Sequence, residues 1–306
     1  MLPSPRFHHL HLNSTDPERA IAFYTRQFPR TAQGEWGGFP ALCSPNDVLI
    51  LFTRVDSPPP VAPQSAFWHF GWHVPDARRY LETYKARPEV RLLPLYTSDE
   101  GGQVLISSDT WPGTGGVLGL TKAQIAEAKE KGVRPRGGAG FAYMRGPDDA
   151  LVEYAGDYPA ERFNHVHLYQ EDPIGALDWY RRHLHAPVQP GFTPPAAAAG
   201  GPVPRSPERT WPALEREGMM RTPRAGVAFG DVALLWYANQ GERPLAPSRG
   251  QLIDHIALSV ADLDAWIGKL RAEGVGFLAG PYRLGPVRAV MIEGPSREAI
   301  ELVEAG

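Results

Sequence analysis

The fold is decided by a stretch that occurs twice: residues 6–28 read RFHHLHLNSTDPERAIAFYTRQF, and residues 162–184 read RFNHVHLYQEDPIGALDWYRRHL. The two stretches align at a constant offset of 156 without a gap, and they are identical at ten of 23 positions. Similarity of this strength within one chain indicates an internal duplication, and it has to be recognised before other features are interpreted.

Weaker matches extend the repeat to the rest of the chain. They pair His69, Val74 and Asp76 with His255, Val260 and Asp262 at an offset of 186, and Gly146, Pro147 and Glu153 with Gly294, Pro295 and Glu301 at an offset of 148. The chain therefore divides into four units, which begin near residues 6, 66, 162 and 252.

Each unit has the same order of expected elements. An apolar or alternating run predicts a first strand at 7–12, 67–74, 163–169 and 252–260. An aspartate then stands at 16, 76, 172 and 262, followed by proline in two cases, as at a helix N-cap and first helical position. Later strand-like runs lie at 47–53, 103–108, 231–237 and 289–292. The predicted unit is βαβββ, and the fold class is α+β.

Composition narrows the class of protein. Glycine and proline together make up 32 + 32 = 64 of 306 residues, which is typical of short elements joined by turns, and 42% hydrophobic residues suffice for a packed core. A net charge of 31 − 34 = −3 without a basic run predicts no nucleic-acid partner, and no apolar stretch is long enough for a membrane span. The N-terminus has no apolar signal core, so a cytoplasmic protein is expected, and a single Cys43 excludes an internal disulfide. Two insertions, 112–140 and 193–224, do not fit the unit.

Histidines and glutamates recur at equivalent places in the units. One histidine occupies the same position in each first strand, and one glutamate closes the second and the fourth unit: His9, His69, His165 and His255, with Glu153 and Glu301. On a strand, Glu301 shares its face with Ala299 and Val303, where an ionised carboxylate is costly unless it is paired or bound to a metal. Two histidines and one carboxylate are the donor set of non-haem Fe(II) sites and could equally hold Mn or Zn.

The order of elements, the histidine in the first strand and the terminal Gly-Pro-x-x-x-x-x-Glu resemble the vicinal oxygen chelate superfamily, which includes glyoxalase I, bleomycin resistance proteins and type I extradiol dioxygenases. The resemblance covers essentially the whole chain. It implies four βαβββ modules paired into two domains, each a cup-shaped mixed sheet with flanking helices, at 1–160 (modules 1 and 2) and 161–306 (modules 3 and 4).

In this superfamily, two modules form a cup around one metal ion, with ligands from both first strands and from the last strand. With the expected pairing, the resemblance implies one set of ligands in each half: His165, His255 and Glu301, and His9, His69 and Glu153. In some ring-cleaving members module 1 pairs with module 4 instead, which would give His9, His255 and Glu301. His255 and Glu301 belong together in either arrangement.

The sequence also bears on the type of reaction. Glyoxalase-like members take a fourth ligand from the last strand of the first module, and the matching strands 47–52 and 231–236 contain none. Three ligands favour oxygen chemistry, because substrate and O₂ need vacant positions. The resemblance places a tyrosine ten residues before the glutamate, where Tyr143 stands. The usual acid/base histidine has no match, and the candidates to replace it are His11, His73 and His167.

Three functions stay open. The first is an Fe(II) extradiol-type dioxygenase that cleaves a dihydroxylated aromatic ring with O₂. The second is a metal-dependent lyase or isomerase of glyoxalase or epimerase type. The third is a metal-free protein that binds a small molecule and confers resistance. In each case the expected partner is a small molecule, and the sequence leaves a homo-oligomer open.

Overall fold

The computed structural model describes residues 2–92, 105–106, 117–118, 127, 130–132, 141–156, 158–193, 201, 223–239 and 243–305. Most of the two insertions and part of the expected strand 103–108 lie outside these ranges. None of the described helices is long and apolar enough to cross a membrane.

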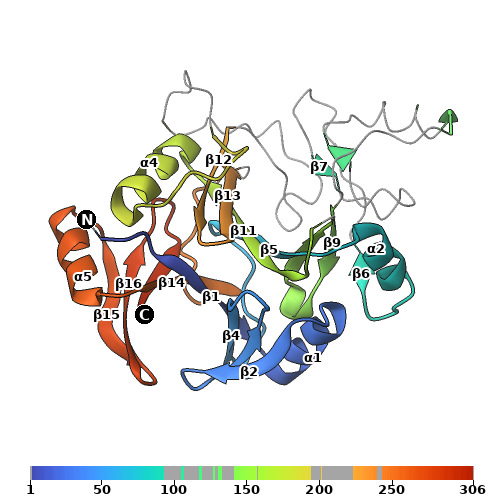
Figure 1. Ribbon diagram of the computed structural model, residues 1–306, viewed down its shortest axis with the longest axis horizontal. Coiled ribbons are helices and arrows are strands. Elements are labelled where there is room, and N and C mark those ends of the chain that lie inside the picture. Colours follow the sequence, from blue (N-terminus) through green and yellow to red (C-terminus); the bar gives the residue numbers. More distant parts are fainter. Residues whose placement is uncertain are drawn as a thin grey trace.

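The four units form the expected elements (Figure 1). Unit 1 contains β1 (Arg6–Ser14), α1 (Pro17–Gln27), β2 (Ala32–Trp36), β3 (Phe39–Cys43) and β4 (Leu49–Arg54). Unit 2 contains β5 (Phe67–His73), α2 (Ala77–Lys85), β6 (Arg91–Leu92), β7 (Leu105–Ile106), β8 (Val117–Leu118), β9 (Phe141–Arg145), the short helix η1 (Pro147–Asp149) and β10 (Leu151–Ala155). Unit 3 contains β11 (Arg162–Gln170), α4 (Pro173–Leu184), β12 (Arg224–Phe229) and β13 (Val232–Ala238). Unit 4 contains β14 (Ile253–Val260), α5 (Leu263–Ala272), β15 (Phe277–Leu284), β16 (Val287–Glu293) and β17 (Ala299–Glu304).

The four aspartates cap α1, α2, α4 and α5 as predicted. The side chains of Asp16, Asp76, Asp172 and Asp262 each accept a hydrogen bond from the backbone N–H three residues later. Each bond satisfies one of the N–H groups that a helix leaves free at its start. Unit 3 departs slightly from the pattern, since the strand expected before β12 is represented by an isolated bridge between Val188 and Val227.

The sheets pair the units differently from the expected arrangement. One sheet has eight strands in the order β15-β16-β17-β14-β1-β4-β3-β2, a second has seven in the order β12-β13-β11-β5-β10-β9-β6, and β7 and β8 form a separate two-stranded sheet. Unit 1 therefore shares a sheet with unit 4, and unit 2 with unit 3, so the pairing within 1–160 and within 161–306 is wrong. In each sheet the central contact is an antiparallel pair of first strands, β1 with β14 and β11 with β5.

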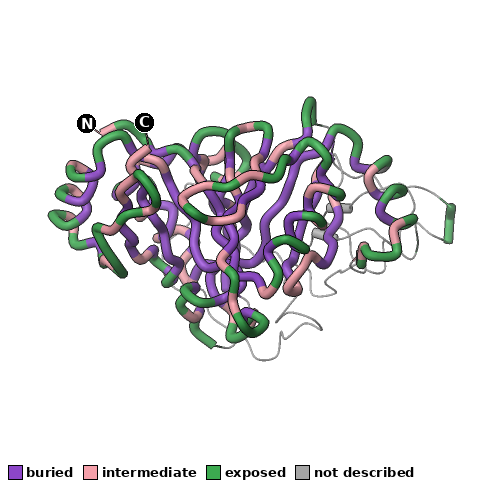
Figure 2. The backbone as a smooth tube through the Cα atoms, turned by 90° about the horizontal axis from the view of Figure 1, so that it is seen from below, coloured by how far each residue is buried: buried purple, intermediate pink, exposed green. Residues whose placement is uncertain are grey.

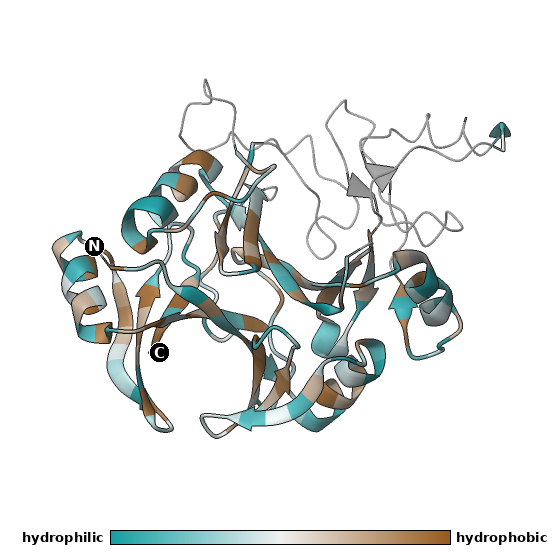
Figure 3. Cartoon of the chain, viewed as in Figure 1, coloured by the Kyte–Doolittle hydropathy of each residue, from teal (hydrophilic) through white to brown (hydrophobic). Residues whose placement is uncertain are grey.

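One continuous core joins the two sheets. Trp72 of β5 stacks on Phe28 at 4.2 Å and on Tyr24 of α1 at 5.7 Å between ring centroids, so a helix of unit 1 packs against a strand of the other sheet. Figure 2 shows buried chain through the middle of the molecule and exposed chain at its periphery, and Figure 3 shows apolar residues in the central strands while the edge strand β2 is hydrophilic. The two chain ends lie side by side, because β1 and β17 flank β14 in one sheet.

Candidate metal centres

The eight-stranded sheet brings four donor side chains together, which we call the eight-strand cluster: His9 and His11 of β1, His255 of β14 and Glu301 of β17. The three histidines each offer a nitrogen within 4.8 Å of the others. Glu301 Oε2 lies 3.5 Å from His9 Nε2 and 3.9 Å from His255 Nε2. All four side chains are buried.

The inward atoms of this cluster fit a divalent cation. Within the described part of the chain, His9 Nε2, His255 Nε2 and Glu301 Oε2 are buried and have no hydrogen-bond partner. Buried polar atoms are rarely left without a partner, because the lost hydration is not replaced. Donors that hold one ion at about 2.1 Å lie roughly 3.0–3.5 Å from one another, close to the distances between these atoms. His9, His255 and Glu301 could therefore hold a metal ion.

The outward atoms of His255 and Glu301 form hydrogen bonds with neighbouring side chains. His255 Nδ1 donates to Asp254 Oδ1 at 2.6 Å, and Arg249 Nη1 donates to the same oxygen at 2.6 Å. The Tyr282 hydroxyl donates to Glu301 Oε1. A hydrogen bond to the outer nitrogen of a histidine fixes its tautomer and leaves the inner lone pair free for a metal.

The electrostatics favour neutral imidazoles. Burial, reinforced by His255 and its neighbours, lowers the pKa of His9 well below its usual value, and it lowers the pKa of His11 to about 3. Burial also raises the pKa of Glu301, although His255 and Tyr282 oppose that change. Neutral imidazole is the form that binds a metal ion, so these histidines are ready to act as ligands near pH 7.

The eight-strand cluster lines a cavity of about 350 Å³. Its walls include Phe39, Leu284 and Met291, and Asn13 and Arg249 add polar groups. The hairpin tips beside it approach closely, because a methyl group added to Gly285 would lie 3.2 Å from Gly37 Cα. The sheet thus curls around a space of the size that small-molecule sites have.

The seven-stranded sheet repeats the arrangement in a second group, which we call the seven-strand cluster: His69 of β5, Glu153 of β10, and His165 and His167 of β11. Glu153 Oε2 lies 2.9 Å from His69 Nε2 and 3.5 Å from His165 Nε2. All four residues offer donor atoms within 4.8 Å of one another, and all are buried.

Charges in the seven-strand cluster differ from those in the eight-strand cluster. Burial alone would raise the pKa of Glu153, but His165 and His69 outweigh it and hold that pKa well below its usual range. Burial lowers the pKa of His69 to about 4 despite the opposing effect of Glu153. Tyr143, opposite Glu153 in the β9–β10 pair, has its pKa raised by burial and by that carboxylate. The predicted tyrosine therefore lies beside this cluster.

The structure separates the two sets of ligands expected from pairing within each half. His165 lies in the seven-stranded sheet, whereas His255 and Glu301 lie in the eight-stranded sheet. Likewise, His9 is not in the sheet that contains His69 and Glu153. The arrangement observed is the alternative one, in which His9, His255 and Glu301 meet, and duplication brings His165, His69 and Glu153 together in the same way.

The four acid/base candidates have different positions. His11 and His167 lie inside the clusters, and Tyr143 lies beside one of them, with its ring 5.0 Å from that of His69. His73 is not among the grouped donors of the described residues. It stacks on Tyr158, with its ring 6.4 Å from that of His165.

Sequence reasoning missed that each cluster has a fourth donor and that Asp254 supports a histidine. The signal for the fourth donor was present in the His-x-His spacing of residues 9–11 and 165–167, since alternate residues of a strand share a face. Asp254 directly precedes His255, and nothing in a single sequence indicates that its side chain turns toward the histidine ring.

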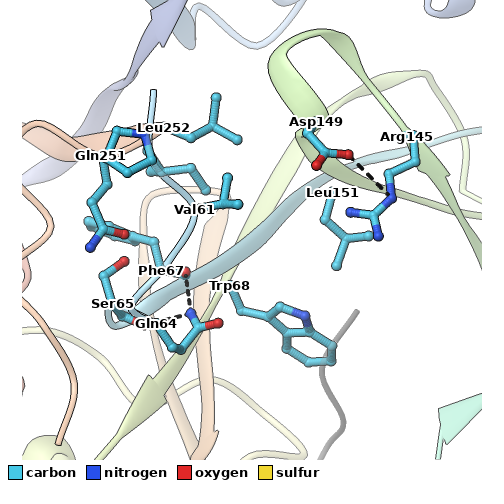
Figure 4. A pocket seen from close by; sticks show the side chains of 12 residues that line it. Val61, Gln64, Ser65, Phe67, Trp68, Arg145, Asp149, Leu151, Gln251 and Leu252 are labelled. Atoms are coloured by element: carbon cyan, nitrogen blue, oxygen red, sulfur yellow. Dashed lines mark hydrogen bonds and ion pairs between the residues drawn. The ribbon is translucent and has the colours of Figure 1, made fainter. Parts of the chain in front are cut away.

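A smaller cavity lies between the two sheets, and Trp68, whose ring contacts His69, is part of its lining (Figure 4). It measures about 40 Å³, and its rim includes Trp68, Gln251 and the ion pair between Arg145 and Asp149 at 3.7 Å. A space of this size holds about one water molecule. Of these two cavities, only the one above the eight-strand cluster has room for an organic substrate.

Comparison with known proteins agrees with the fold. The family model described as Glyoxalase/Bleomycin resistance protein/Dioxygenase superfamily matches residues 162–302. Glyoxalase I from Zea mays is 15% identical with a TM-score of 0.60, covering 98% of this chain and 92% of that one. A candidate dioxygenase from Bacillus subtilis subsp. subtilis strain 168 is 12% identical with a TM-score of 0.51, covering 99% and 86%. At these identities the likeness concerns the fold alone. No curated protein matches the sequence.

Proposed function

The chain belongs to the glyoxalase/bleomycin resistance protein/dioxygenase superfamily, in its two-domain, four-module arrangement, and from this we propose that it is a mononuclear metal-dependent enzyme whose reaction centre is the eight-strand cluster. One observation carries the proposal. Three buried donor atoms that lack hydrogen-bond partners among the described residues, on His9, His255 and Glu301, lie close together in the lining of a cavity of about 350 Å³.

In this proposal, His9, His255 and Glu301 hold Fe(II), with Mn or Zn as alternatives. Two imidazoles and one carboxylate on one side of the ion are typical of non-haem Fe(II) oxygenases. The metal would supply a Lewis-acid centre with positions open to a substrate and to O₂. We propose that the enzyme is an extradiol-type ring-cleaving dioxygenase.

His11 is the proposed acid/base residue. Its Nε2 lies 2.7 Å from Thr53 Oγ1, and its ring lies 4.6 Å from that of His255, so the side chain is held in place beside the triad. Because burial and the nearby His255 keep its pKa low, His11 is neutral and can accept a proton from a substrate hydroxyl. Tyr282, which donates to Glu301 Oε1, orients the carboxylate so that Oε2 faces the triad.

The cavity favours an aromatic substrate with vicinal oxygens. Phe39, Leu284 and Met291 give it apolar walls, while the donor cluster is part of its lining. An aromatic ring held between such walls would direct two neighbouring hydroxyl groups toward the triad. Arg249, at the polar side of the cavity, adds a positive charge that would favour an anionic group on the ring.

A metal-dependent lyase or isomerase is the second candidate, and one observation favours it. His11 brings a third imidazole to the triad, and this is a fourth protein donor of the kind that strands 47–52 and 231–236 do not supply. If His11 were a ligand, fewer positions would remain for O₂. The whole-chain likeness in fold to maize glyoxalase I is compatible with this candidate and with the first.

Metal loading and O₂ uptake together test the proposal. The protein is stripped with a chelator, reloaded anaerobically with Fe(II), Mn(II) or Zn(II), and assayed with a panel of catechols. We expect O₂ uptake with Fe(II), which Glu301→Gln abolishes and Glu304→Gln retains, because Glu304 lies on the opposite face of β17 and pairs with Arg288. Metal-dependent turnover without O₂ uptake would support the lyase or isomerase. A protein that binds none of the three metals would be a metal-free binder, and the proposal would be wrong.

A further inference from the structure

The two clusters occupy equivalent positions in a duplicated chain, yet their neighbours differ. His9, His11, His255 and Glu301 correspond to His165, His167, His69 and Glu153 by the offsets 156, 186 and 148. In both clusters the second histidine of the His-x-His strand stacks on the histidine of the partner strand, at 4.6 Å for His11 on His255 and 4.5 Å for His167 on His69. Differences between the clusters therefore come from the surrounding side chains.

The first difference concerns the residue next to the second histidine, which is His11 in one cluster and His167 in the other. Thr53 pairs with Asn13 in the β1–β4 ladder, and Tyr237 pairs with Tyr169 at the same place in the β11–β13 ladder. Thr53 holds His11 Nε2 by a hydrogen bond at 2.7 Å. Tyr237 instead stacks flat on His167, with ring centroids 5.5 Å apart and planes at 5°.

Among the described residues, His167 consequently has a ring nitrogen that is not used in a hydrogen bond. Its Nδ1 is buried, and no residue that the structure describes offers it a hydrogen bond. The ring is fixed between two aromatic neighbours, with His69 on one side and Tyr237 on the other.

The second difference lies opposite the glutamate. Met291 faces Glu301 across the β16–β17 pair and lines the cavity, whereas Tyr143 faces Glu153 across the β9–β10 pair. Tyr143 also lies at 5.0 Å from the ring of His69. A rigid aromatic side chain thus packs against the seven-strand cluster where the eight-strand cluster has a flexible one.

A third aromatic residue, Trp68, also packs against the seven-strand cluster. The Trp68 ring lies 4.2 Å from that of His69, 5.9 Å from that of His167 and 6.1 Å from that of Tyr237. Trp68, Tyr143 and Tyr237 therefore pack aromatic rings against His69 and His167 of the seven-strand cluster.

From these contacts we propose that the seven-strand cluster is a second metal site, with four protein ligands, His69, Glu153, His165 and His167, and a structural role. Its donors all lie within 4.8 Å of one another, and the pairs that involve Glu153 Oε2 lie 2.9 and 3.5 Å apart. Four donors at about 2.0–2.1 Å complete a tetrahedral shell, the closed arrangement of structural Zn²⁺ sites, whereas a catalytic site keeps a position open.

The support of His165 agrees with a ligand role. Its Nδ1 lies 3.1 Å from the Asn164 side-chain oxygen, which can only accept, so Nδ1 carries the proton and the Nε2 lone pair faces Glu153. Asn164 stands directly before His165, as Asp254 stands before His255. The chain would therefore carry one open site for reaction and one closed site that ties β5, β10 and β11 together.

The test uses the full chain with the eight-strand cluster disabled by Glu301→Gln, so it does not depend on any activity. The chelated variant is titrated with Zn²⁺ and with Co²⁺, and metal bound per chain, the visible Co²⁺ spectrum and the melting temperature are measured. We expect one ion per chain, intense four-coordinate Co²⁺ bands and a higher melting temperature with metal. Adding Glu153→Gln to the variant should remove metal binding.

Two further variants separate a ligand role from a packing role. Adding His167→Gln should leave weaker binding and pale Co²⁺ bands, because three ligands admit water, whereas His73→Gln on β5 should retain the intense bands. Circular dichroism checks that each variant is folded. A Glu301→Gln protein that binds no metal, or whose Co²⁺ bands are pale from the start, would overturn the proposal. Absence of turnover by the wild-type protein would concern the proposed function and not this second metal site.

Discussion

At the residue scale, the partner of one histidine distinguishes the two centres. His11 and His167 are repeats of each other, but among the residues that the structure describes only His11 has a hydroxyl within hydrogen-bond distance, that of Thr53. A histidine held in this way beside an open triad can exchange a proton with a substrate, whereas one packed between aromatic rings can only be a ligand or a core residue. The role of each histidine therefore follows from its neighbour on the adjacent strand.

This assignment predicts the effect of His11→Asn. Because His11 would transfer a proton and not hold the metal, kcat should fall roughly 10²–10⁴-fold while the metal content stays unchanged. Steady-state kinetics and metal analysis of the same preparation measure both quantities. His183→Gln, which alters a pair with Glu273 between α4 and α5, is the matched control. Loss of metal from the His11 variant would make His11 a ligand and favour the lyase or isomerase.

At the scale of elements, the helices α1, α2, α4 and α5 each begin directly after an aspartate, and the eight- and seven-stranded sheets are each centred on two first strands. The helices flank the sheets, so their caps contribute to stability without touching the clusters. The hairpin tips act differently: Gly37 and Gly285 both have positive φ, at 61° and 54°, and their close approach brings the edges β2 and β15 together. Elements far apart in the sequence thereby enclose one cavity.

The cap of α5 gives a prediction at this scale. Asp262 Oδ1 accepts from Ala265 N at 2.9 Å, so Asp262→Ala leaves a helix N–H group without that partner and should lower the free energy of unfolding by about 1 kcal/mol. Chemical denaturation measures the change. Asp262→Ser keeps a capping oxygen and should retain most of the stability. Equal losses in the two variants would show that the carboxylate acts in another way.

At the scale of the whole molecule, the sequence halves are interleaved. β1 of the first half pairs with β14 of the second, and β11 of the second half pairs with β5 of the first. Both candidate metal centres draw ligands from both halves. Folding therefore requires contacts between residues that are far apart in the chain, and their loop-closure entropy has to be offset by the large shared core.

Separate expression of the halves tests this interleaving. Residues 1–160 alone should not form a stable domain, because β1 and β5 lose the strands that pair with them at the centre of each sheet. Co-expression with residues 161–306 should restore a folded complex that binds metal. Circular dichroism and gel filtration measure both outcomes. A folded, monomeric 1–160 fragment would show that units 1 and 2 can pair with each other after all.

Buried histidines predict how stability depends on pH in the metal-free protein. Burial lowers the pKa of five of them below the unfolded value of 6.5, to about 3 or 4 where a number is resolved: His9, His11, His69, His73 and His167. Below pH 6.5 the unfolded chain binds more protons than the folded chain, so the free energy of unfolding falls as the pH falls from 6.5 toward 4. The slope is at most about 1.4 kcal/mol per pH unit for each histidine.

Urea unfolding of the chelated protein at pH 7.5 and pH 5.5 measures this dependence. We expect lower stability at pH 5.5 than at pH 7.5. Added Zn²⁺ should raise the stability at pH 7.5 more than at pH 5.5, because protons compete with the metal for the same nitrogens. Equal stability of the metal-free protein at the two pH values would mean that the buried histidines become protonated as easily as in the unfolded chain.

The sequence by itself determined the repeat, the α+β class, the four capped helices, the first strands and the donor residues. Each of these depends on local spacing: aspartate before a helix, alternation along a strand, and histidine two residues from histidine. Such patterns predict which face a side chain occupies, and they hold in any arrangement of the units.

Only the tertiary structure decided which units share a sheet and therefore which donors meet. β1 has similar apolar faces whether it pairs with β5 or β14, so the sequence pattern does not distinguish the two pairings, and the choice depends on packing across the whole core. The same holds for the fourth donors and for Asp254, since contacts with Thr53, Tyr237 and His255 arise only when adjacent strands are in register. Local chemistry supplied the ligands, and non-local packing assembled them into two centres that are not alike.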